Sequence, residues 1–401
     1  MAVTILPVEG GVCAPSGFRA AAARAGIRAS DKDDLALIVS NLPCTFGAMG
    51  TQNLVRAWCV DWCLGIRPEA GPRAIVCNAG TANACNGPEG KDANLAMARR
   101  VAEALGLDSP NEVFVASTGV IGKQFPLALA EPGIEIAARA LEASPEASER
   151  AANAILTTDL VPKSFAVEVV GRGAGFRVGG IAKGSGMIAP NMATMLAFVT
   201  TDARVETPRL QEVWRRVVDR TFHCVTVDGD TSTNDLALVL ANGASGVAPD
   251  SDETLERALE VVCCELAKKI AADGEGATKL VTIRVTGAQG PARTIAKTIA
   301  ESPLVKTALF GNDPNWGRIL AAAGRSGEPI DANKASVWIG PHLLFAQGVP
   351  VPFDKDAVSE SMKAKEVEVS LDLGNPAGHA ATVWTCDFSY DYVRINAEYT
   401  T

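Results

Sequence analysis

The sequence predicts an α/β protein, because short apolar runs typical of buried strands alternate with longer segments whose apolar residues recur at helical spacing. Hydrophobic residues make up 47% of the chain and charged residues 21%, as in ordinary globular proteins. A length of 401 residues leaves room for two or three domains.

Strand and helix signals follow one another along the first 280 residues. An amphipathic helix is predicted over 94–107, between buried strands at 73–80 and 112–117. Thr207 and Pro208 are typical of a helix start and predict a helix over 207–222. Ser251 or Asp252 caps a further helix over 251–276, with Gly274 as its stop. Further strands are expected at 166–170, 194–201, 235–241 and 280–287.

The last part of the chain is richer in strand signals. We expect strands within 336–340, 367–373 and 380–396. The change of pattern predicts a boundary near residue 280, with a larger unit over 1–280 and a smaller α/β unit over 281–401.

Composition and charge exclude several classes of protein. The formal net charge is −9 and aromatic residues make up 5%, which disfavours a nucleic-acid-binding surface. The N-terminus has no signal-peptide pattern, and no apolar run approaches the ~20 residues that span a bilayer. We therefore expect a cytoplasmic protein that binds neither nucleic acid nor membrane.

The ten cysteines do not form a recognisable metal or disulfide pattern. There is no C-x-x-C pair, and only three histidines could serve as further ligands. The acidic stretch VDGDTSTND (227–235) lacks the glutamate and spacing of an EF-hand. We expect reduced, mostly buried cysteines, no metal, and a structural turn at 227–235.

Familiar catalytic motifs are absent. No G-x-S-x-G or P-loop occurs. GSGMIA (184–189) fits the looser G-x-G-x-x-A pattern of a dinucleotide site, but Pro190 would sit in the first turns of the helix that should receive the pyrophosphate.

Thr194 offers a different chemistry. It follows a glycine-rich turn and opens an apolar run in KGSGMIAPNMATMLAFVTTDA (183–203). A threonine with a free α-amine needs no histidine, because that amine has a pKa near neutral and can take the hydroxyl proton. An internal threonine gains such an amine only if the bond before it, Ala193–Thr194, is cut. The alternative is an ordinary strand threonine.

Several motifs then resemble one family. The 183–203 segment, ASTGVIG (116–122), VDGDTSTND (227–235), GNDPNWGRI (311–319) and YDYVRINAEYTT (390–401) closely resemble the ornithine acetyltransferase (glutamate N-acetyltransferase) family of arginine biosynthesis. The resemblance implies a layered α-β-β-α sandwich of the kind found in self-processing aminopeptidases. It also implies self-cleavage into chains 1–193 and 194–401, which stay together as a heterotetramer of two of each, with the catalytic site in the 1–280 unit and a C-terminal tail that returns to it.

The resemblance assigns roles to particular residues. Thr194 is the nucleophile, and Thr118 and Gly119 form the oxyanion hole. Lys183 binds substrate, for instance through the α-carboxylate of the substrate. Glu275 binds either the amine of the substrate or the new N-terminal amine. Thr157 (with Thr158 as the alternative), Asn396 and Thr401 are further substrate contacts. The segment MGTQNLVRAWCVDWC (49–63) departs from the family pattern, which leaves pocket shape and substrate preference open.

The implied reaction is ping-pong transfer of the acetyl group of N-acetylornithine to glutamate through acetyl-Thr194, without a cofactor. Acetyl-CoA is a possible further donor for N-acetylglutamate synthesis. Two alternatives remain: a self-processing aminopeptidase or amidohydrolase of the same fold, and an unprocessed, non-enzymatic binding protein.

Overall fold

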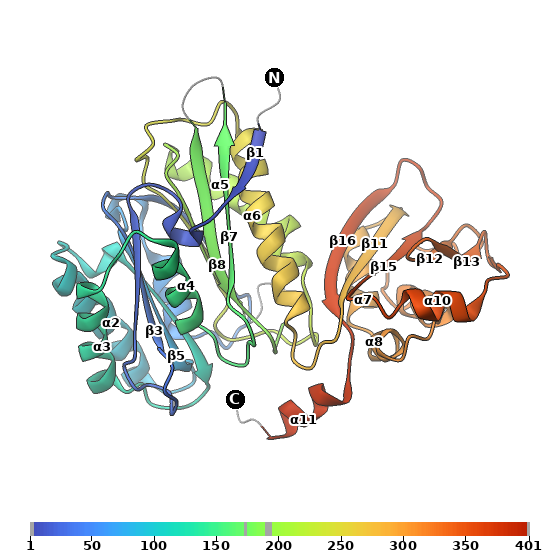
Figure 1. Ribbon diagram of the computed structural model, residues 1–401, viewed down its shortest axis with the longest axis horizontal. Helices are drawn as coiled ribbons and strands as arrows, with labels where there is room; N and C mark the ends of the chain where they lie inside the picture. The colour runs from blue at the N-terminus through green and yellow to red at the C-terminus, as the bar shows by residue number, and fades with distance from the viewer. Residues whose placement is uncertain (1–3, 172–174, 189–194, 399–401) are drawn as a thin grey trace.

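A computed structural model describes residues 4–171, 175–188 and 195–398. Figure 1 shows two sheets that lie face to face between layers of helices, and a third sheet beside them. The predicted α/β class and the layered sandwich are confirmed.

The sheets combine strands from distant parts of the chain. The first sheet has the order β1 (Thr4–Val8), β7 (Lys163–Val170), β8 (Phe176–Lys183), β9 (Leu196–Thr201), β10 (Leu236–Ala241) and β4 (Thr45–Gly50). The second has the order β2 (Phe18–Ala23), β3 (Leu35–Ser40), β5 (Ala74–Thr81) and β6 (Val113–Val120). The third has the order β14 (Val349–Pro350), β13 (His342–Ala346), β12 (Ser336–Ile339), β15 (Glu366–Asp372), β11 (Leu280–Ala288) and β16 (His379–Cys386).

The inner strands of the sandwich, such as β3, β9 and β10, are buried on both faces, which explains their continuous apolar sequences, whereas the edge strand β1 is partly exposed. In β3, Ala36 and Ile38 enter the core between the first and second sheets, whereas Leu35 and Leu37 enter the core beneath the outer helices. The two-residue period of a strand thus divides one apolar run between two cores.

Helices cover the outer faces. α2 and α3 lie on the second sheet, and α5 and α6 lie on the first (Figure 1). The helices are α1 (Trp58–Gly65), α2 (Pro88–Leu105), α3 (Leu127–Arg139), α4 (Pro145–Ala154), α5 (Thr207–Arg220), α6 (Asp252–Ala272), α7 (Ala292–Ala300), α8 (Pro303–Phe310), α9 (Trp316–Gly324), α10 (Lys355–Ser361) and α11 (Tyr390–Glu398). In the part of the chain described, none combines the length and hydropathy needed for a transmembrane span.

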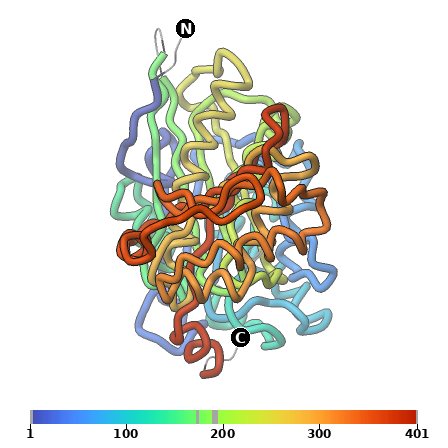
Figure 2. Tube along the Cα trace, turned by 90° about the vertical axis from the view of Figure 1, so that its right-hand side faces the viewer, coloured from blue at the N-terminus to red at the C-terminus, as the bar shows by residue number. Residues whose placement is uncertain are grey.

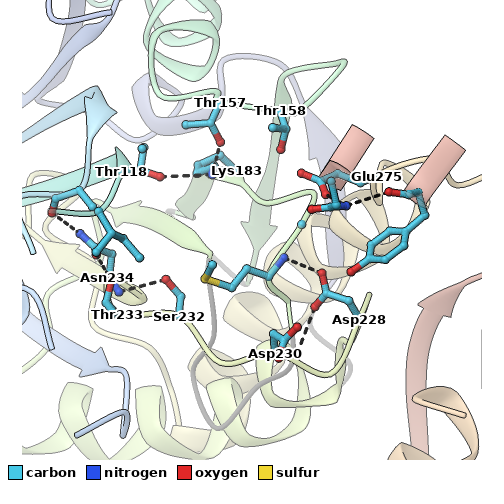
Figure 3. Close-up of a pocket in the computed structure, with 17 residues that line it drawn as sticks. Thr118, Thr157, Thr158, Lys183, Asp228, Asp230, Ser232, Thr233, Asn234 and Glu275 are labelled. Carbon is cyan, nitrogen blue, oxygen red and sulfur yellow. Dashed lines mark hydrogen bonds between the residues drawn. The ribbon is translucent and has the colours of Figure 1, made fainter. Parts of the chain in front are cut away.

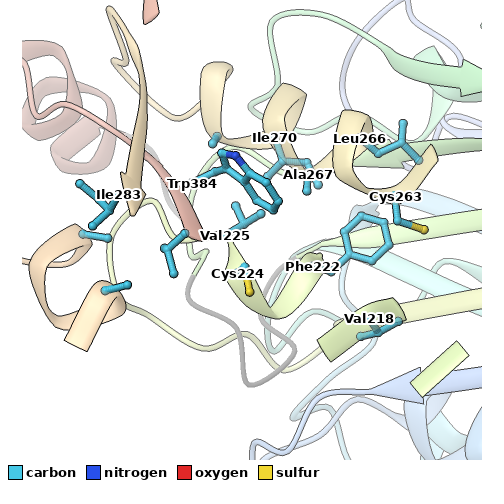
Figure 4. Packing of buried hydrophobic residues seen from close by; sticks show 14 of the residues in the cluster. Val218, Phe222, Cys224, Val225, Cys263, Leu266, Ala267, Ile270, Ile283 and Trp384 are labelled. Carbon is cyan, nitrogen blue, oxygen red and sulfur yellow. The ribbon is translucent and has the colours of Figure 1, made fainter. Parts of the chain in front are cut away.

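The third sheet is joined to the sandwich by a shared apolar core. Trp384 of β16 lies beside Ala267 and Ile270 of α6, with Val225 close by (Figure 4). Figure 2, viewed from this side, shows the strands of the third sheet in front of the sandwich and α11 at the lower end. The third sheet begins with β11 at Leu280, but its core is continuous with that under the first sheet, so the division into two domains at 280 stays a prediction.

The expectation of a strand-rich tail over 380–396 is wrong for its second half. β16 ends at Cys386, and residues 390–398 form α11. Asp387 leaves the ladder to accept the backbone N–H groups of Thr278 and Lys279 at 2.8 and 3.1 Å. The Ser389 hydroxyl then accepts the N–H of Asp391 at 3.2 Å, which favours a helical turn over continued extension.

Element starts agree with the capping signals to within a residue or two. Ser251 accepts the N–H of Thr254, as an N-cap does, and α6 begins at Asp252. α5 begins at Thr207, with Glu206 rather than Thr207 in the cap position. β9 begins at Leu196, and Thr194 lies outside the described residues.

Candidate active site

A cavity of about 130 Å³ lies where ends of the first and second sheets meet α11 and the loop after α6. Its walls carry hydroxyls, one ammonium group and several carboxylates (Figure 3). The lining residues are Ala82, Thr118, Gly119, Ile121, Thr157, Thr158, Lys183, Gly186, Met187, Asp228, Asp230, Ser232, Thr233, Asn234, Glu275, Tyr392 and Asn396.

Thr118 and Gly119 reach this cavity at the end of β6, where its parallel pairing with β5 becomes irregular between Gly80 and Thr81. Gly119 has a φ of +128°, which L-residues rarely adopt. A Cβ on Gly119 would press against the backbone of Gly80 and lie 2.7 Å from the nitrogen of Thr81. Only glycine fits this crossing of the two strands.

Gly119→Ala is therefore expected to displace the strand ends and to lower kcat by roughly 10²-fold or more, the scale of a lost oxyanion-hole donor. Gly122→Ala is the matched control, since Gly122 also has a positive φ, of +82°, but no atom within 4 Å of an added Cβ. Steady-state kinetics of the two variants test the role of the crossing. Equal kinetics in both would show that the close approach at Gly119 has no part in turnover.

Lys183 is the last residue of β8, and its side chain is buried. Its Nζ donates to Thr157 Oγ1 at 2.7 Å and to Thr118 Oγ1 at 3.4 Å (Figure 3). The ammonium group thus joins the predicted oxyanion-hole threonine to the predicted binding threonine. Thr157, not Thr158, makes this contact, although both line the cavity.

A buried ion cluster stands behind Lys183. Asp159 Oδ2 lies 3.7 Å from Lys183 Nζ, and Asp159 Oδ1 accepts from Lys163 Nζ at 2.7 Å. Lys163 also reaches Asp273 at 2.6 Å. Burial alone would raise the pKa of Asp159, but the charges of Lys183 and Lys163 outweigh it and lower the pKa to about 2. The cluster keeps Asp159 ionised and fixes the position of the Lys183 ammonium.

Glu275 faces the cavity from the loop that follows α6. A Cβ on Gly186 would collide with its carboxylate, so glycine at 186 makes room for the acid. Glu275 Oε2 accepts a hydrogen bond of 2.8 Å from Asn396 Nδ2 of α11 (Figure 3). This bond ties the C-terminal helix to the cavity wall.

The 227–235 loop forms much of another wall. Asn234 Nδ2 donates to the carbonyl groups of Ala82 and Ser117 at 2.6 and 2.9 Å, and so links this loop to the ends of β5 and β6. Asp228 accepts the N–H groups of Met187 and Ile188 at 2.7 and 2.8 Å. Burial raises the pKa of the Asp228 carboxyl to about 6. The predicted structural turn is thus also a wall of the cavity.

The divergent segment at 49–63 supports that loop. Thr51 Oγ1 donates to the carbonyl of Ser232 at 2.9 Å, and Ala57 N–H donates to that of Thr233 at 2.9 Å. The segment leads into α1. The segment also contacts the lining residue Asn234, through Cys59, and strand β6, through Cys63, so its sequence can influence the cavity through both.

Six of the predicted site residues meet at this one cavity, although they come from five separate parts of the sequence: Thr118, Gly119, Thr157, Lys183, Glu275 and Asn396. Ala193, Thr194 and Thr401 lie outside the described residues. The roles of all nine stay predictions.

Sequence reasoning missed Asp159, Asp228 and Asn234 as parts of the site. Asp159 lies two residues after Thr157, but only the structure shows that this acid is buried beside the site. Asp228 and Asn234 were contained in a motif that had been interpreted as a turn. Among the described residues, no group of histidine, cysteine and carboxylate side chains has an arrangement that could hold a metal.

The fold and this cavity define an α/β-sandwich enzyme with a small-molecule site. Residues 19–401 match the model of the ArgJ family, and the chain belongs to that family. The arginine biosynthesis bifunctional protein ArgJ of Synechocystis sp. is 47% identical over 411 residues, which cover 98% of each chain.

Two solved structures match about half of the chain. That of the arginine biosynthesis bifunctional protein from Bacillus halodurans is 41% identical, with a TM-score of 0.48, and covers 50% of this chain and 98% of its own. That of ornithine acetyltransferase from Mycobacterium tuberculosis, complexed with ornithine, is 38% identical, with a TM-score of 0.42, and covers 47% of this chain and 98% of its own.

Family membership confirms the resemblance drawn from the motifs and the prediction of an arginine-biosynthesis enzyme. A non-enzymatic binding protein is no longer an alternative.

Proposed function

We propose that this enzyme transfers the acetyl group of N-acetylornithine to glutamate through an acetyl-Thr194 intermediate. The observation that carries the proposal is the convergence of six predicted site residues on one small cavity, in a chain that belongs to the ArgJ family. The cavity offers both an ammonium group and carboxylates, which suits a substrate that bears both signs of charge.

The first half-reaction forms the acyl-enzyme. Thr194 Oγ attacks the acetyl carbonyl, and its proton passes to the free α-amine of the same residue. Backbone N–H groups at Thr118 and Gly119 stabilise the oxyanion. The C–N bond then breaks, the α-ammonium returns the proton to the departing nitrogen, and ornithine leaves.

The second half-reaction regenerates the enzyme. The amine of glutamate attacks the ester carbonyl and gives a proton to the α-amine. The C–O bond breaks, Thr194 Oγ recovers the proton, and N-acetylglutamate leaves. The bond between Lys183 and Thr118 supports this assignment, because a fixed ammonium beside the oxyanion hole would hold a substrate carboxylate near the reacting carbonyl.

The remaining parts of the proposal concern assembly and location. We expect self-cleavage between Ala193 and Thr194, a heterotetramer of two copies of each chain, and a cytoplasmic location. The reaction as written needs no cofactor, and acetyl-CoA is proposed as a further acetyl donor.

A direct comparison of two assays tests the function. Purified enzyme is expected to move acetyl from N-acetylornithine to glutamate and to release little amine from short peptides. A self-processing aminopeptidase would give the reverse, because water would then resolve the acyl-enzyme. Peptide hydrolysis without acetyl transfer would contradict the proposal.

A further inference from the structure

Both flanks of the 189–194 segment are held by one short loop. Ile188, on the upstream side, is buried, and its carbonyl accepts the N–H of Val227 at 2.6 Å and the hydroxyl of Thr226 at 3.1 Å. Met195, on the downstream side, is buried too, and its carbonyl accepts the N–H of Leu236 at 3.1 Å. Residues 226–236 thus contact the chain immediately before and after the segment.

Two aspartates of this loop bind the N–H groups of the same flanks. Asp228 uses both carboxylate oxygens, Oδ2 for Met187 and Oδ1 for Ile188, at 2.7 and 2.8 Å. Met187 has a φ of +56°, in the left-handed region that costs a non-glycine residue free energy. The Asp228 carboxylate therefore stabilises a sharp turn just upstream of the segment.

Asp235 holds the downstream flank with a single oxygen. Its side chain is fully buried, and Oδ1 accepts the N–H of Met195 at 2.7 Å. Oδ2 accepts no hydrogen bond of good geometry among the described residues; burial raises the pKa of this carboxyl well above its usual range, and the neighbouring Thr51 hydroxyl only partly opposes that. A buried carboxyl group with one partner is costly to keep unless its position serves a purpose.

We propose that Asp228 and Asp235 are positioning residues that hold the two flanks of the 189–194 segment for self-cleavage. The inference rests on the proposed function, since it presupposes the cut between Ala193 and Thr194. Intramolecular attack on a peptide carbonyl requires the reacting groups to be held at short range, and one loop fixes the described residues on both sides of the bond that is to be cut.

The hydrogen-bond pattern predicts different tolerances at the two positions. Asparagine at 228 keeps only one acceptor oxygen, so one of the two N–H groups would face an amide donor. Asparagine at 235 can still accept the N–H of Met195 with its amide oxygen, and its amide nitrogen can take the position of Oδ2. Alanine removes the acceptor at either position.

The test is a time course of precursor conversion on denaturing gels for the full chain. Asp228→Ala, Asp235→Ala and Asp228→Asn are expected to slow cleavage by at least about tenfold, the factor for one lost buried hydrogen bond. Asp235→Asn is expected to cleave within about threefold of the unmodified chain, since its bond to Met195 is kept. Asp250→Asn, at an exposed carboxylate before α6, is the matched control and should cleave as the unmodified chain does.

Thermal unfolding of the uncut variants separates positioning from folding. The alanine variants should unfold near the temperature of uncut Thr194→Ala. A large further drop would assign the carboxylates to fold stability and overturn the inference, as would normal cleavage in the alanine variants or equal behaviour of the two asparagine variants. Cleavage of Thr194→Ala itself would instead contradict the proposed function.

Discussion

Thr194→Ala is expected to yield a single uncut chain of 401 residues with no acetyl transfer. Alanine has no Oγ to attack the preceding carbonyl, and without the cut no free α-amine arises at residue 194. Both the nucleophile and its base are thus lost in one substitution. The measurement is a denaturing gel of freshly purified protein, followed by N-terminal sequencing and an acetyl-transfer assay.

Thr194→Ser is the matched control, because it keeps the hydroxyl and removes the methyl group that restricts χ1. It should still yield fragments 1–193 and 194–401, more slowly than threonine does. Efficient cleavage of the alanine variant, or a new N-terminus at another residue, would remove Thr194 from the mechanism.

Local sequence signals predicted the elements well where one rule governed them. The Ser251 cap and the continuous apolar runs of the buried strands each depend on a few neighbouring residues. α11 was missed because its aromatic and β-branched residues, Tyr390, Tyr392, Val393 and Ile395, are typical of strands. Its start depends instead on the contacts of Asp387 and Ser389.

In the candidate site, too, the sequence indicated single residues but not the contacts between distant segments. Motif resemblance named Lys183 and Glu275, which the fold brings to one cavity. The sequence could not show that Lys183 is buried against Asp159, or that Gly186 makes room for Glu275, since these are contacts between segments tens of residues apart. Local patterns do not encode such distances, and only the closed sandwich sets them.

The Asp159 cluster allows the role of Lys183 to be tested against a matched lysine. Lys183 and Lys163 are both buried ammonium groups within 4 Å of Asp159, but only Lys183 lines the cavity. Lys183→Met is expected to reduce acetyl transfer by several orders of magnitude, through loss of substrate binding and positioning. Lys163→Met should stay within about tenfold of the unmodified enzyme once folded, because its partners lie behind the site.

Both substitutions leave Asp159 with one cation fewer, and removing one partner of a buried ion pair costs about 3–5 kcal/mol. We therefore expect a loss in the free energy of unfolding for both variants, larger for Lys163→Met because Asp273 also loses its ammonium partner, but the larger kinetic loss for Lys183→Met. Unfolding is to be measured by denaturant titration. The kinetic constants kcat and KM are to be measured while the concentrations of N-acetylornithine and glutamate are varied separately. Equal kinetic losses in the two variants would mean that Lys183 acts through the stability of the cluster, and its assignment as a substrate-binding residue would then be wrong.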